Sequence, residues 1–272
     1  YRGTVDNNWV QFGGFYWRII RINGDGTIRM IYSGIDNGIV TDANRIGENT
    51  QIGISAFNDT MDDNAYVGYM YGTPGSSTYE ETHANIHDST IKTVLDTWYQ
   101  NNLSSYSQYI SYDIGFCGDR ELANDSSNGN GAGQTQTNYK GIERNRLYSN
   151  PSLMCNQVAD FYTVKTSING NKTLNYPVGL ITADEVLYAG GIWGSENTSY
   201  YLYTQYSYYT MTPTYYLSSY SMSDVFYINT MGNLDYNYGV YGVRGVRPVI
   251  NLKADTLFTG TGTLTDPYVV VE

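Results

Sequence analysis

Basic residues are scarce in this chain of 272 residues. Its 15 Lys and Arg are outnumbered by 26 Asp and Glu, which leaves a formal net charge of -11 at pH 7. A chain this acidic has no general positive field, so we expect it to bind neither nucleic acid nor an anionic membrane surface. Long hydrophobic runs are also missing, and no stretch approaches the roughly 20 apolar residues of a membrane span.

An initiator Met and a signal peptide are both missing from the start of the chain, which reads YRGTVDNNWV. We therefore expect a trimmed ectodomain whose membrane or pilus attachment depends on a segment before Tyr1. Aromatic residues at 15%, little charge and abundant Asn, Ser, Thr and Gly are typical of proteins on the bacterial surface or outside the cell. No linker-like change of composition divides the chain, which we interpret as a single domain over residues 1–272.

Complete catalytic motifs are absent as well. His83 and His87 have the i, i+4 spacing of a zinc-peptidase helix, but Ala84 stands where that motif needs a glutamate as general base. No Ser or Cys nucleophile has a neighbouring histidine, and no glycine-rich phosphate motif follows a strand. We expect a protein that is not an enzyme, with no catalytic residue and no cofactor.

Acidic and polar clusters are only weak candidates for calcium. Asp59, Asp62 and Asp63 supply the carboxylate oxygens that Ca²⁺ prefers, but without the spacing of a calcium loop. Residues 124–131 faintly resemble such a loop and lack the bidentate glutamate that would close its coordination. We expect no metal site, and structural calcium at the three aspartates is the alternative.

Only two cysteines are present, Cys117 in GFCGDR and Cys155 in SLMCNQ, on either side of a segment rich in Asn, Gly and Gln. In an oxidising compartment they would pair. Closing a loop of this length stabilises a fold by about 3–4 kcal/mol in the chain-entropy model. Two unpaired buried thiols are the alternative.

Tyrosine is the residue that the chain has in excess. Between Tyr200 and Tyr241, 13 of 42 residues are tyrosine, set among Ser, Asn, Thr, Asp and Gly, and residues 206–246 include no Lys, Glu, Gln, Trp, His, Ala or Cys. Tyrosine makes wide contacts with only two side-chain torsions, and small polar residues add adaptable hydrogen bonds, as in antibody paratopes. The tract at about 200–246 is therefore typical of a binding surface. A tyrosine-rich β surface that only packs is the alternative.

Secondary-structure signals are strongest in the first half. Residues 15–22 and 27–32 predict two strands joined by a hairpin turn at Asn23-Gly24-Asp25-Gly26, where both glycines accept positive φ. Apolar residues at helical spacing after Ser89 predict a capped amphipathic helix over about 90–102.

A capping box at residues 182–185 predicts a second, shorter helix that ends at Gly190 and Gly191. Beyond Tyr200 the chain reads as short strands and loops, with strands at 225–229 and 247–252 and a turn at 230–233. Two main helices, many loops and an antiparallel sheet joining the two chain ends make an α+β fold.

Several segments, in the same order along nearly the whole chain, resemble a family of gut-bacterial surface proteins, some of them pilin-like. The segments are FYWRIIRINGDGTIRMIYSG, STIKTVLDTWYQNNL, FCGDR, YPVGLITADEVLYAGG, YYLYT, GVRPVINLKAD and TGTGTLTDPYVV. GVRPV is similar to the closing strand of C-type-lectin-like domains of the formylglycine-generating-enzyme type. Variable proteins of diversity-generating retroelements display a mutated surface on that fold, so the resemblance implies such a domain and matches the two cysteines, which favours a disulfide.

Randomising the adenines of an AAC or AAT codon gives Asn, Tyr, Ser, Asp, Thr and Gly but never Lys, Glu, Gln, Trp or Met, so Met222 and Met231 would be unvaried. Two features depart from the family: about two dozen residues follow GVRPV, and the cysteines do not match the copper-binding pair of the oxidases in the superfamily. The resemblance therefore implies no enzymatic activity. It implies a fixed framework, namely Thr210, Met211, Pro213, Val225, Phe226, Gly232, Leu234, Gly245, Val246, Arg247 and Pro248.

The positions between the framework residues are our candidate ligand-binding residues, and we expect them on one exposed face. They are Tyr206, Tyr208, Tyr215, Tyr216, Ser218, Ser219, Tyr220, Ser223, Asp224, Tyr227, Asn229, Asn233, Asp235, Asn237, Tyr238 and Tyr241. The expected partner is an extracellular protein or glycan. A conventional calcium-dependent lectin, or an enzyme of the formylglycine-generating superfamily, is the competing hypothesis.

Overall fold

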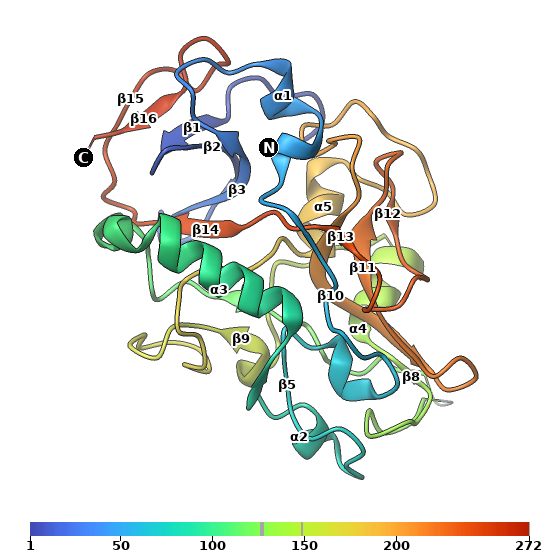
Figure 1. The fold of residues 1–272 in the computed structure, drawn as a ribbon. Coiled ribbons are helices and arrows are strands. Elements are labelled where there is room, and N and C mark those ends of the chain that lie inside the picture. The colour runs from blue at the N-terminus through green and yellow to red at the C-terminus, as the bar shows by residue number, and fades with distance from the viewer. Residues whose placement is uncertain (126–127, 148, 272) are drawn as a thin grey trace.

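The first sheet brings the two ends of the chain together (Figure 1). The computed structural model describes residues 1–125, 128–147 and 149–271. The strand order of this first sheet is β14-β3-β2-β1-β16-β15. The strands are β1 (Trp9–Phe12), β2 (Phe15–Ile22), β3 (Ile28–Ile35), β14 (Val249–Leu252), β15 (Phe258–Thr259) and β16 (Tyr268–Val270). The predicted joining of the two ends is confirmed, but the sheet is mixed, because β1 and β16 run parallel while the other pairs are antiparallel.

The hairpin of β2 and β3 forms as predicted. Asn23 accepts a hydrogen bond from Gly26 N at 2.9 Å and donates its own N–H to Thr27 O at 2.8 Å. Gly26 has φ +87°, whereas Gly24 is not in the left-handed region, so only one glycine of the turn uses its conformational freedom. Phe15–Ile22 coincides with the first predicted strand, and the second continues to Ile35.

A second sheet is built around residues of the tyrosine-rich tract. Its order is β12-β11-β10-β13-β4, and β8 also pairs with β10. The strands are β4 (Ile54–Ser55), β8 (Thr137–Asn138), β10 (Tyr208–Leu217), β11 (Met222–Ile228), β12 (Leu234–Asp235) and β13 (Arg244–Gly245). The predicted strand at 225–229 falls on the second half of β11 and ends one residue beyond it, and the predicted strand at 247–252 begins two residues before β14 of the first sheet.

Both predicted helices are present with their predicted caps. Ser89 accepts a hydrogen bond from Lys92 N at the start of α3 (Thr90–Asn102). Thr182 and Glu185 form the capping box of α5 (Ala183–Ala189), which Gly190 ends at φ +118°. Three further helices are single turns: α1 (Asp42–Arg45), α2 (Tyr79–Thr82) and α4 (Lys140–Ile142).

The remaining elements are short. Two small sheets pair β5 (Met70–Tyr71) with β6 (His87–Asp88), and β7 (Phe116–Cys117) with β9 (Phe161–Tyr162). The 3₁₀ turns are η1 (Glu48–Thr50), η2 (Asn64–Val67), η3 (Ser104–Tyr109) and η5 (Val158–Asp160), and η4 (Glu143–Leu147) is a π-helical turn.

One apolar core joins the two sheets. A continuous cluster of buried side chains reaches from Val10 in β1 to Val270 in β16, and it includes Phe226 and Val246 of the tract. The strand-rich architecture with few helices is an α+β fold, which is the predicted class. In Figure 1 the hairpin of β10 and β11 extends on the opposite side of the molecule from β15 and β16.

Candidate functional site

The predicted framework of the tract is buried. Val225, Phe226, Leu234 and Val246 have no exposed surface, and Arg247 is 1% exposed. The Arg247 guanidinium donates two hydrogen bonds to Tyr32 O of β3 and one to Leu202 O, at 2.9–3.2 Å. The other framework residues are buried too, namely Thr210, Met211, Pro213, Gly232, Gly245 and Pro248.

Part of the predicted ligand-binding set is also buried, so the expected exposure is wrong for these residues. They are Tyr208, Tyr215, Tyr216, Ser223, Asp224 and Tyr227, each at most 4% exposed. The reason is that β10 and β11 lie in the middle of the second sheet, and β10 contacts α4, α5 and η2 while segment 236–243 hydrogen-bonds across the hairpin. β10 and β11 are therefore buried along their length although the sequence of the tract is polar.

The buried tyrosines use their hydroxyls to hold neighbouring loops. Tyr208 Oη donates to Leu202 O at 2.8 Å, and Tyr216 Oη donates to Asp62 O at 3.2 Å. Tyr209 Oη donates to Gly242 O, and Tyr215 Oη donates to Asn237 Oδ1. Burial raises the pKa of each of these tyrosines, so the hydroxyls stay protonated and act as donors.

Asp224 of β11 holds segment 236–243 in place. Its carboxylate accepts hydrogen bonds from Asn237 N at 2.8 Å and from Gly239 N at 3.3 Å, and it also accepts one from Val225 N at 3.1 Å. Burial raises the pKa of Asp224 to about 6, and these backbone donors oppose the rise. Asp224 is therefore an internal anchor of segment 236–243 rather than a surface contact.

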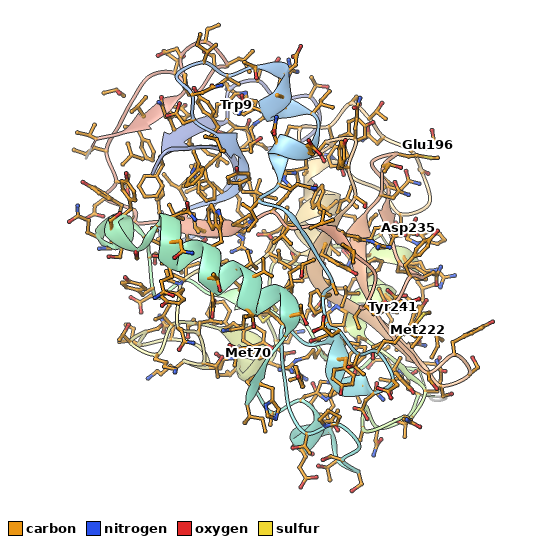
Figure 2. The ribbon with its side chains drawn as sticks, viewed as in Figure 1. Trp9, Met70, Glu196, Met222, Asp235 and Tyr241 are labelled. Carbon is orange, nitrogen blue, oxygen red and sulfur yellow. A yellow bond between two sulfur atoms is a disulfide. The ribbon has the colours of Figure 1, made fainter. Side chains whose placement is uncertain are left out.

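The rest of the predicted set lies at the surface, on turns and loops apart from Asp235 in β12. Tyr220 is 72% exposed, Tyr238 is 63%, Tyr241 is 53% and Tyr206 is 43%. Ser218, Ser219 and Asn237 are also exposed, and Asn229, Asn233 and Asp235 are partly exposed. Figure 2 shows Asp235 and Tyr241 on the side of the molecule formed by β10, β11 and β12. The expectation that loops rather than strands supply most exposed positions is confirmed.

These exposed residues fall into two groups. The hairpin tip carries Ser218, Ser219 and Tyr220, and segment 236–243 lies beside it because Val240 N donates to Ser223 O at 2.9 Å. We call Ser218, Ser219, Tyr220, Asn237, Tyr238 and Tyr241 the display surface. Asn229 hydrogen-bonds to Asn233 O and to the Asp235 carboxylate, each at 3.0 Å. The second group, at the other end of the hairpin because the ten residues of β10 span about 30 Å, is Tyr206, Asn229, Asn233 and Asp235.

Arg244 is a residue of this region that the sequence reasoning missed. Its guanidinium lies 3.7 Å from the Tyr227 ring centre and 5.0 Å from that of Tyr238. Arg244 is 8% exposed, and its Nε has no hydrogen-bond partner among the residues that the structure describes. It is the only basic residue between Tyr206 and Val246, which is the signal that marks it.

An open hollow of about 290 Å³ adjoins the display surface at Asn237. Tyr215 and Tyr236 line it together with Arg146, whose guanidinium lies 4.9 Å from the Trp193 ring centre and 5.4 Å from that of Tyr236. Aromatic rings, a cation and an amide at one hollow suit recognition of a polar ligand.

The histidines of the HANIH motif do not share a helix. His83 follows α2 and is buried, with its ring stacked on Tyr79 at 4.1 Å and Nε2 2.9 Å from Tyr139 Oη. Burial lowers the pKa of His83 well below its usual value, with Arg120 adding to the effect. His87 lies in β6 with its ring near Tyr71, so the i, i+4 geometry of a metal-binding helix is absent.

The aspartates weighed for calcium do not converge either. Asp63 caps η2 and accepts hydrogen bonds from Ala65 N and Gly75 N, whereas Asp59 and Asp62 are exposed. Within residues 1–125, 128–147 and 149–271, no three His, Cys, Asp or Glu side chains form a metal-binding group. Of the faint calcium-loop resemblance at 124–131, residues 126–127 lie outside the described residues.

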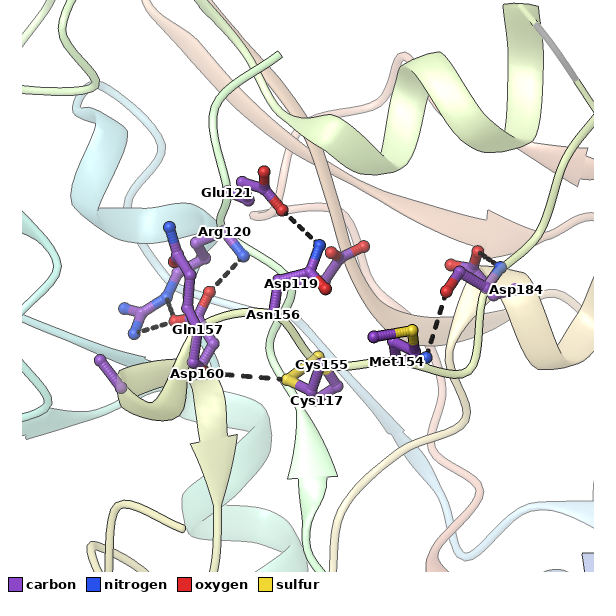
Figure 3. The surroundings of a disulfide bond; sticks show 12 residues. Cys117, Asp119, Arg120, Glu121, Met154, Cys155, Asn156, Gln157, Asp160 and Asp184 are labelled. Atoms are coloured by element: carbon purple, nitrogen blue, oxygen red, sulfur yellow. Dashed lines mark hydrogen bonds and ion pairs between the residues drawn. A yellow bond between two sulfur atoms is a disulfide. The ribbon is translucent and has the colours of Figure 1, made fainter. Parts of the chain in front are cut away.

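Cys117 and Cys155 form a disulfide, with their Cα atoms 5.6 Å apart (Figure 3). Hydrogen bonds fix the chain on both sides of Cys155: Ser152 N donates to Asp184 at 2.7 Å, and Asn156 Nδ2 donates to Glu121 at 2.8 Å. The bridge encloses β8 and α4, both of which pack on β10. The disulfide therefore constrains the segment that packs against the hairpin of β10 and β11.

Comparisons with protein-family models, curated proteins and solved structures give no match for this chain. In the described part of the chain, no helix has the length and apolar character needed to cross a membrane.

Proposed function

We propose that this protein is a diversified ligand-binding module that acts outside the cell and recognises a protein or glycan through the display surface. The finer assignments belong to the same proposal: a C-type-lectin-like domain and a variable protein of a diversity-generating retroelement. The observation that carries it is the division inside the tract, where the framework residues are buried while Tyr220, Tyr238 and Tyr241 are more than half exposed.

This division supports recognition rather than packing. Exposed tyrosines on loops offer large rings with few torsions to a partner, and the neighbouring Ser218, Ser219 and Asn237 add hydrogen-bonding groups. The loops rest on a hairpin that is held by buried side chains, so substitution at an exposed position leaves the scaffold intact. A surface that tolerates change on a fixed support is what diversification requires.

The disulfide is compatible with an oxidising, extracellular location. The acidic charge of -11 argues against a nucleic-acid partner. The hollow beside the display surface is lined by the rings of Tyr215 and Tyr236, the Arg146 cation and amides, groups that suit recognition of a polar ligand.

The test is a screen of the purified protein against arrays of extracellular proteins and glycans, followed by a triple variant Tyr220→Ser, Tyr238→Ser, Tyr241→Ser. We expect this variant to keep its melting temperature and to lose at least about a hundredfold in affinity, as for interface hot spots of about 2 kcal/mol or more. Tyr188→Ser is the matched control, because Tyr188 is an exposed tyrosine on α5, outside the tract. Equal affinity of the triple variant and the parent would refute the proposed surface.

Comparing closely related gene copies tests the diversification itself. We expect substitutions to fall at adenines of the codons for exposed tract positions, and to spare Phe226, Leu234 and Val246. Substitutions spread evenly over all bases and positions would refute diversification by a retroelement. The proposed binding surface would then depend on the ligand screen and the triple variant alone.

A further inference from the structure

A second surface feature lies away from the tract, between the β2–β3 hairpin, residues 41–52 and α3. It is an open trough of about 530 Å³, continued along α3 by a hollow of about 400 Å³. Ile52, Trp98 and Asn102 line both parts, so the two are continuous, and no residue of 200–246 lines either one. We call this feature the Trp98 trough. Its volume falls within the range of ligand sites, about 300–1,000 Å³.

The wall of the trough is aromatic and rigidly held. The Trp98 ring centre lies 5.2 Å from that of Phe15 and 5.7 Å from that of Tyr32, so rings from β2, β3 and α3 support one another. Trp17 adds a fourth ring behind them, 6.2 Å from Trp98. Trp98 itself is only partly buried, and it is the ring shared by both parts of the trough.

The polar side chains around these rings are mostly neutral amides. Asn37, Asn49, Gln51 and Asn102 line the trough, and Glu48 is its only charged lining residue. Asn102 Nδ2 donates to Trp98 O at 2.8 Å, and among the described residues its Oδ1 accepts no hydrogen bond. Amides of this kind donate and accept at the same time, as a pair of adjacent sugar hydroxyls requires.

Tyr32 contributes a hydroxyl that the fold does not use. Its side chain is 3% exposed and lines the trough, yet within the described chain the hydroxyl has no hydrogen-bond partner. The hydroxyl oxygen is not among the fully buried unpaired atoms, so it opens on the trough, where a ligand hydroxyl can pair with it. Burial raises the pKa of Tyr32 to about 12, so the group is a neutral donor and acceptor at physiological pH.

We propose that the Trp98 trough binds a neutral oligosaccharide. The apolar C–H face of a sugar ring packs on an aromatic ring through dispersion and through the negative face of the ring. The amides and the Tyr32 hydroxyl pair with the sugar hydroxyls. Glu48 and the acidic chain as a whole disfavour an anionic sugar, and the amide rim is too polar for a purely apolar segment. This site is independent of the proposed display surface, so either one stands if the other fails.

The test is a titration of the protein with cellohexaose, xylohexaose, mannohexaose and maltohexaose, with hexagalacturonate as the anionic comparison. Tryptophan fluorescence and amide NMR shifts are the readouts. We expect at least one neutral hexasaccharide to bind with a Kd between about 10 µM and 1 mM, and to shift the amides of residues 98–102. Trp98→Ala weakens that binding at least about tenfold, a change of about 1.4 kcal/mol, whereas Trp98→Phe keeps most of it.

Tyr32→Phe is the second variant, since it removes only the unpaired hydroxyl and leaves the ring packing. We expect Tyr32→Phe to lower the oligosaccharide affinity about threefold to tenfold. This loss tests binding in the trough even if Trp98→Ala does not fold. Tyr188→Ala leaves the affinity unchanged, because Tyr188 is exposed on α5 and lines neither the trough nor the display surface. The proposal is overturned if no neutral hexasaccharide binds at about 10 mM, if only hexagalacturonate binds, or if binding survives Tyr32→Phe and the Trp98 variants at full strength.

Discussion

The two hairpins of this protein are buried by different chemistry. β2 and β3 bury Trp17, Ile19, Ile20, Met30 and Ile31, with the charged heads of their arginines paired or stacked. β10 and β11 are as deeply buried, but β10 reads YYTMTPTYYL. A tyrosine in a core carries a polar tip that needs a partner, so the second hairpin is tied by its hydroxyls to the loops around it.

This difference shows how one residue type serves two roles in the tract. Tyr209 and Tyr215 reach from β10 to segment 236–243, where Tyr238 and Tyr241 are exposed. The inner tyrosines thus hold the loop that presents the outer ones. The β2–β3 hairpin holds its neighbours through other side chains: Ser33 Oγ donates to Asn44 O at 2.6 Å, and the Arg18 guanidinium donates to Val5 O at 2.6 Å.

The largest expected effect comes from removing an apolar residue at the centre of the second hairpin. Phe226→Ala empties a fully buried site beside Tyr236, whose ring centre lies 5.8 Å away, and lowers the free energy of unfolding by about 3–5 kcal/mol. Urea denaturation measures this. Tyr238→Ala is the control, with a change of about 0.5 kcal/mol or less. Similar losses in both variants would contradict the division of the tract into framework and display surface.

The disulfide should rank next. Replacing Cys117 and Cys155 together by Ser leaves the 38-residue connection unstapled and costs about 3–4 kcal/mol of unfolding free energy. Because the enclosed segment supplies β8 and α4 to the second hairpin, we expect hydrogen exchange to accelerate in β10 before it does so in β2. Equal exchange in the two hairpins would mean that the bridge does not support the tract selectively. Two free thiols in oxidatively folded protein would show that Cys117 and Cys155 do not form the disulfide.

Asp224 gives a smaller, pH-dependent effect. Its pKa in the fold, about 6, lies above that of a free aspartate, so the native state binds the proton more tightly than the unfolded chain. Its contribution to the unfolding free energy therefore falls as pH rises from about 4 to about 6, by at most about 1.4 kcal/mol per pH unit, and is constant above that range. Asp224→Asn keeps an acceptor for Asn237 N and Gly239 N without the charge.

The measurement is the stability difference between Asp224→Asn and the parent at several pH values. We expect the advantage of the variant to grow from pH 4 to pH 6 and then to level off. A difference that does not change with pH would show that Asp224 is not the buried acid described above.

The smallest expected effect isolates one hydroxyl. Tyr215→Phe removes the hydrogen bond to Asn237 and lowers stability by about 1 kcal/mol, and it should speed amide exchange in segment 236–243. Tyr220→Phe is the matched control, because Tyr220 lies at the hairpin tip and is 72% exposed. Identical exchange in the two variants would mean that the inner tyrosines do not hold the loop.

Features encoded by neighbouring residues could be predicted from the sequence. The turn at 23–26, the Ser89 cap of α3 and the capping box of α5 each depend on residues within four positions of one another, and each is present in the fold. The pairing of Gly245 with Ile54 is different, because two-residue strands far apart in the chain carry no pattern of their own. The sequence therefore predicts the second sheet only in part.

The candidate site shows the same limit. A tyrosine-rich strand in a core and a tyrosine-rich loop in a binding surface have the same local composition, so the burial of Tyr208 and Tyr216 could not be separated from the exposure of Tyr220. The sequence does not predict the Trp98 trough either. The spacing of α3 predicts that Trp98 belongs to its apolar side, but Phe15 and Gln51 reach the same place only through the tertiary fold.

The parallel pairing of β1 with β16 has a mechanical consequence. A force that pulls the two ends of the described chain apart draws β1 and β16 in opposite directions along their shared axis, so their hydrogen bonds are loaded together in shear rather than opened one at a time. The second sheet lies outside this line of force, because the first sheet alone contains both strands. When the protein is held at one end and pulled at the other, the display surface therefore keeps its structure until β1 and β16 separate.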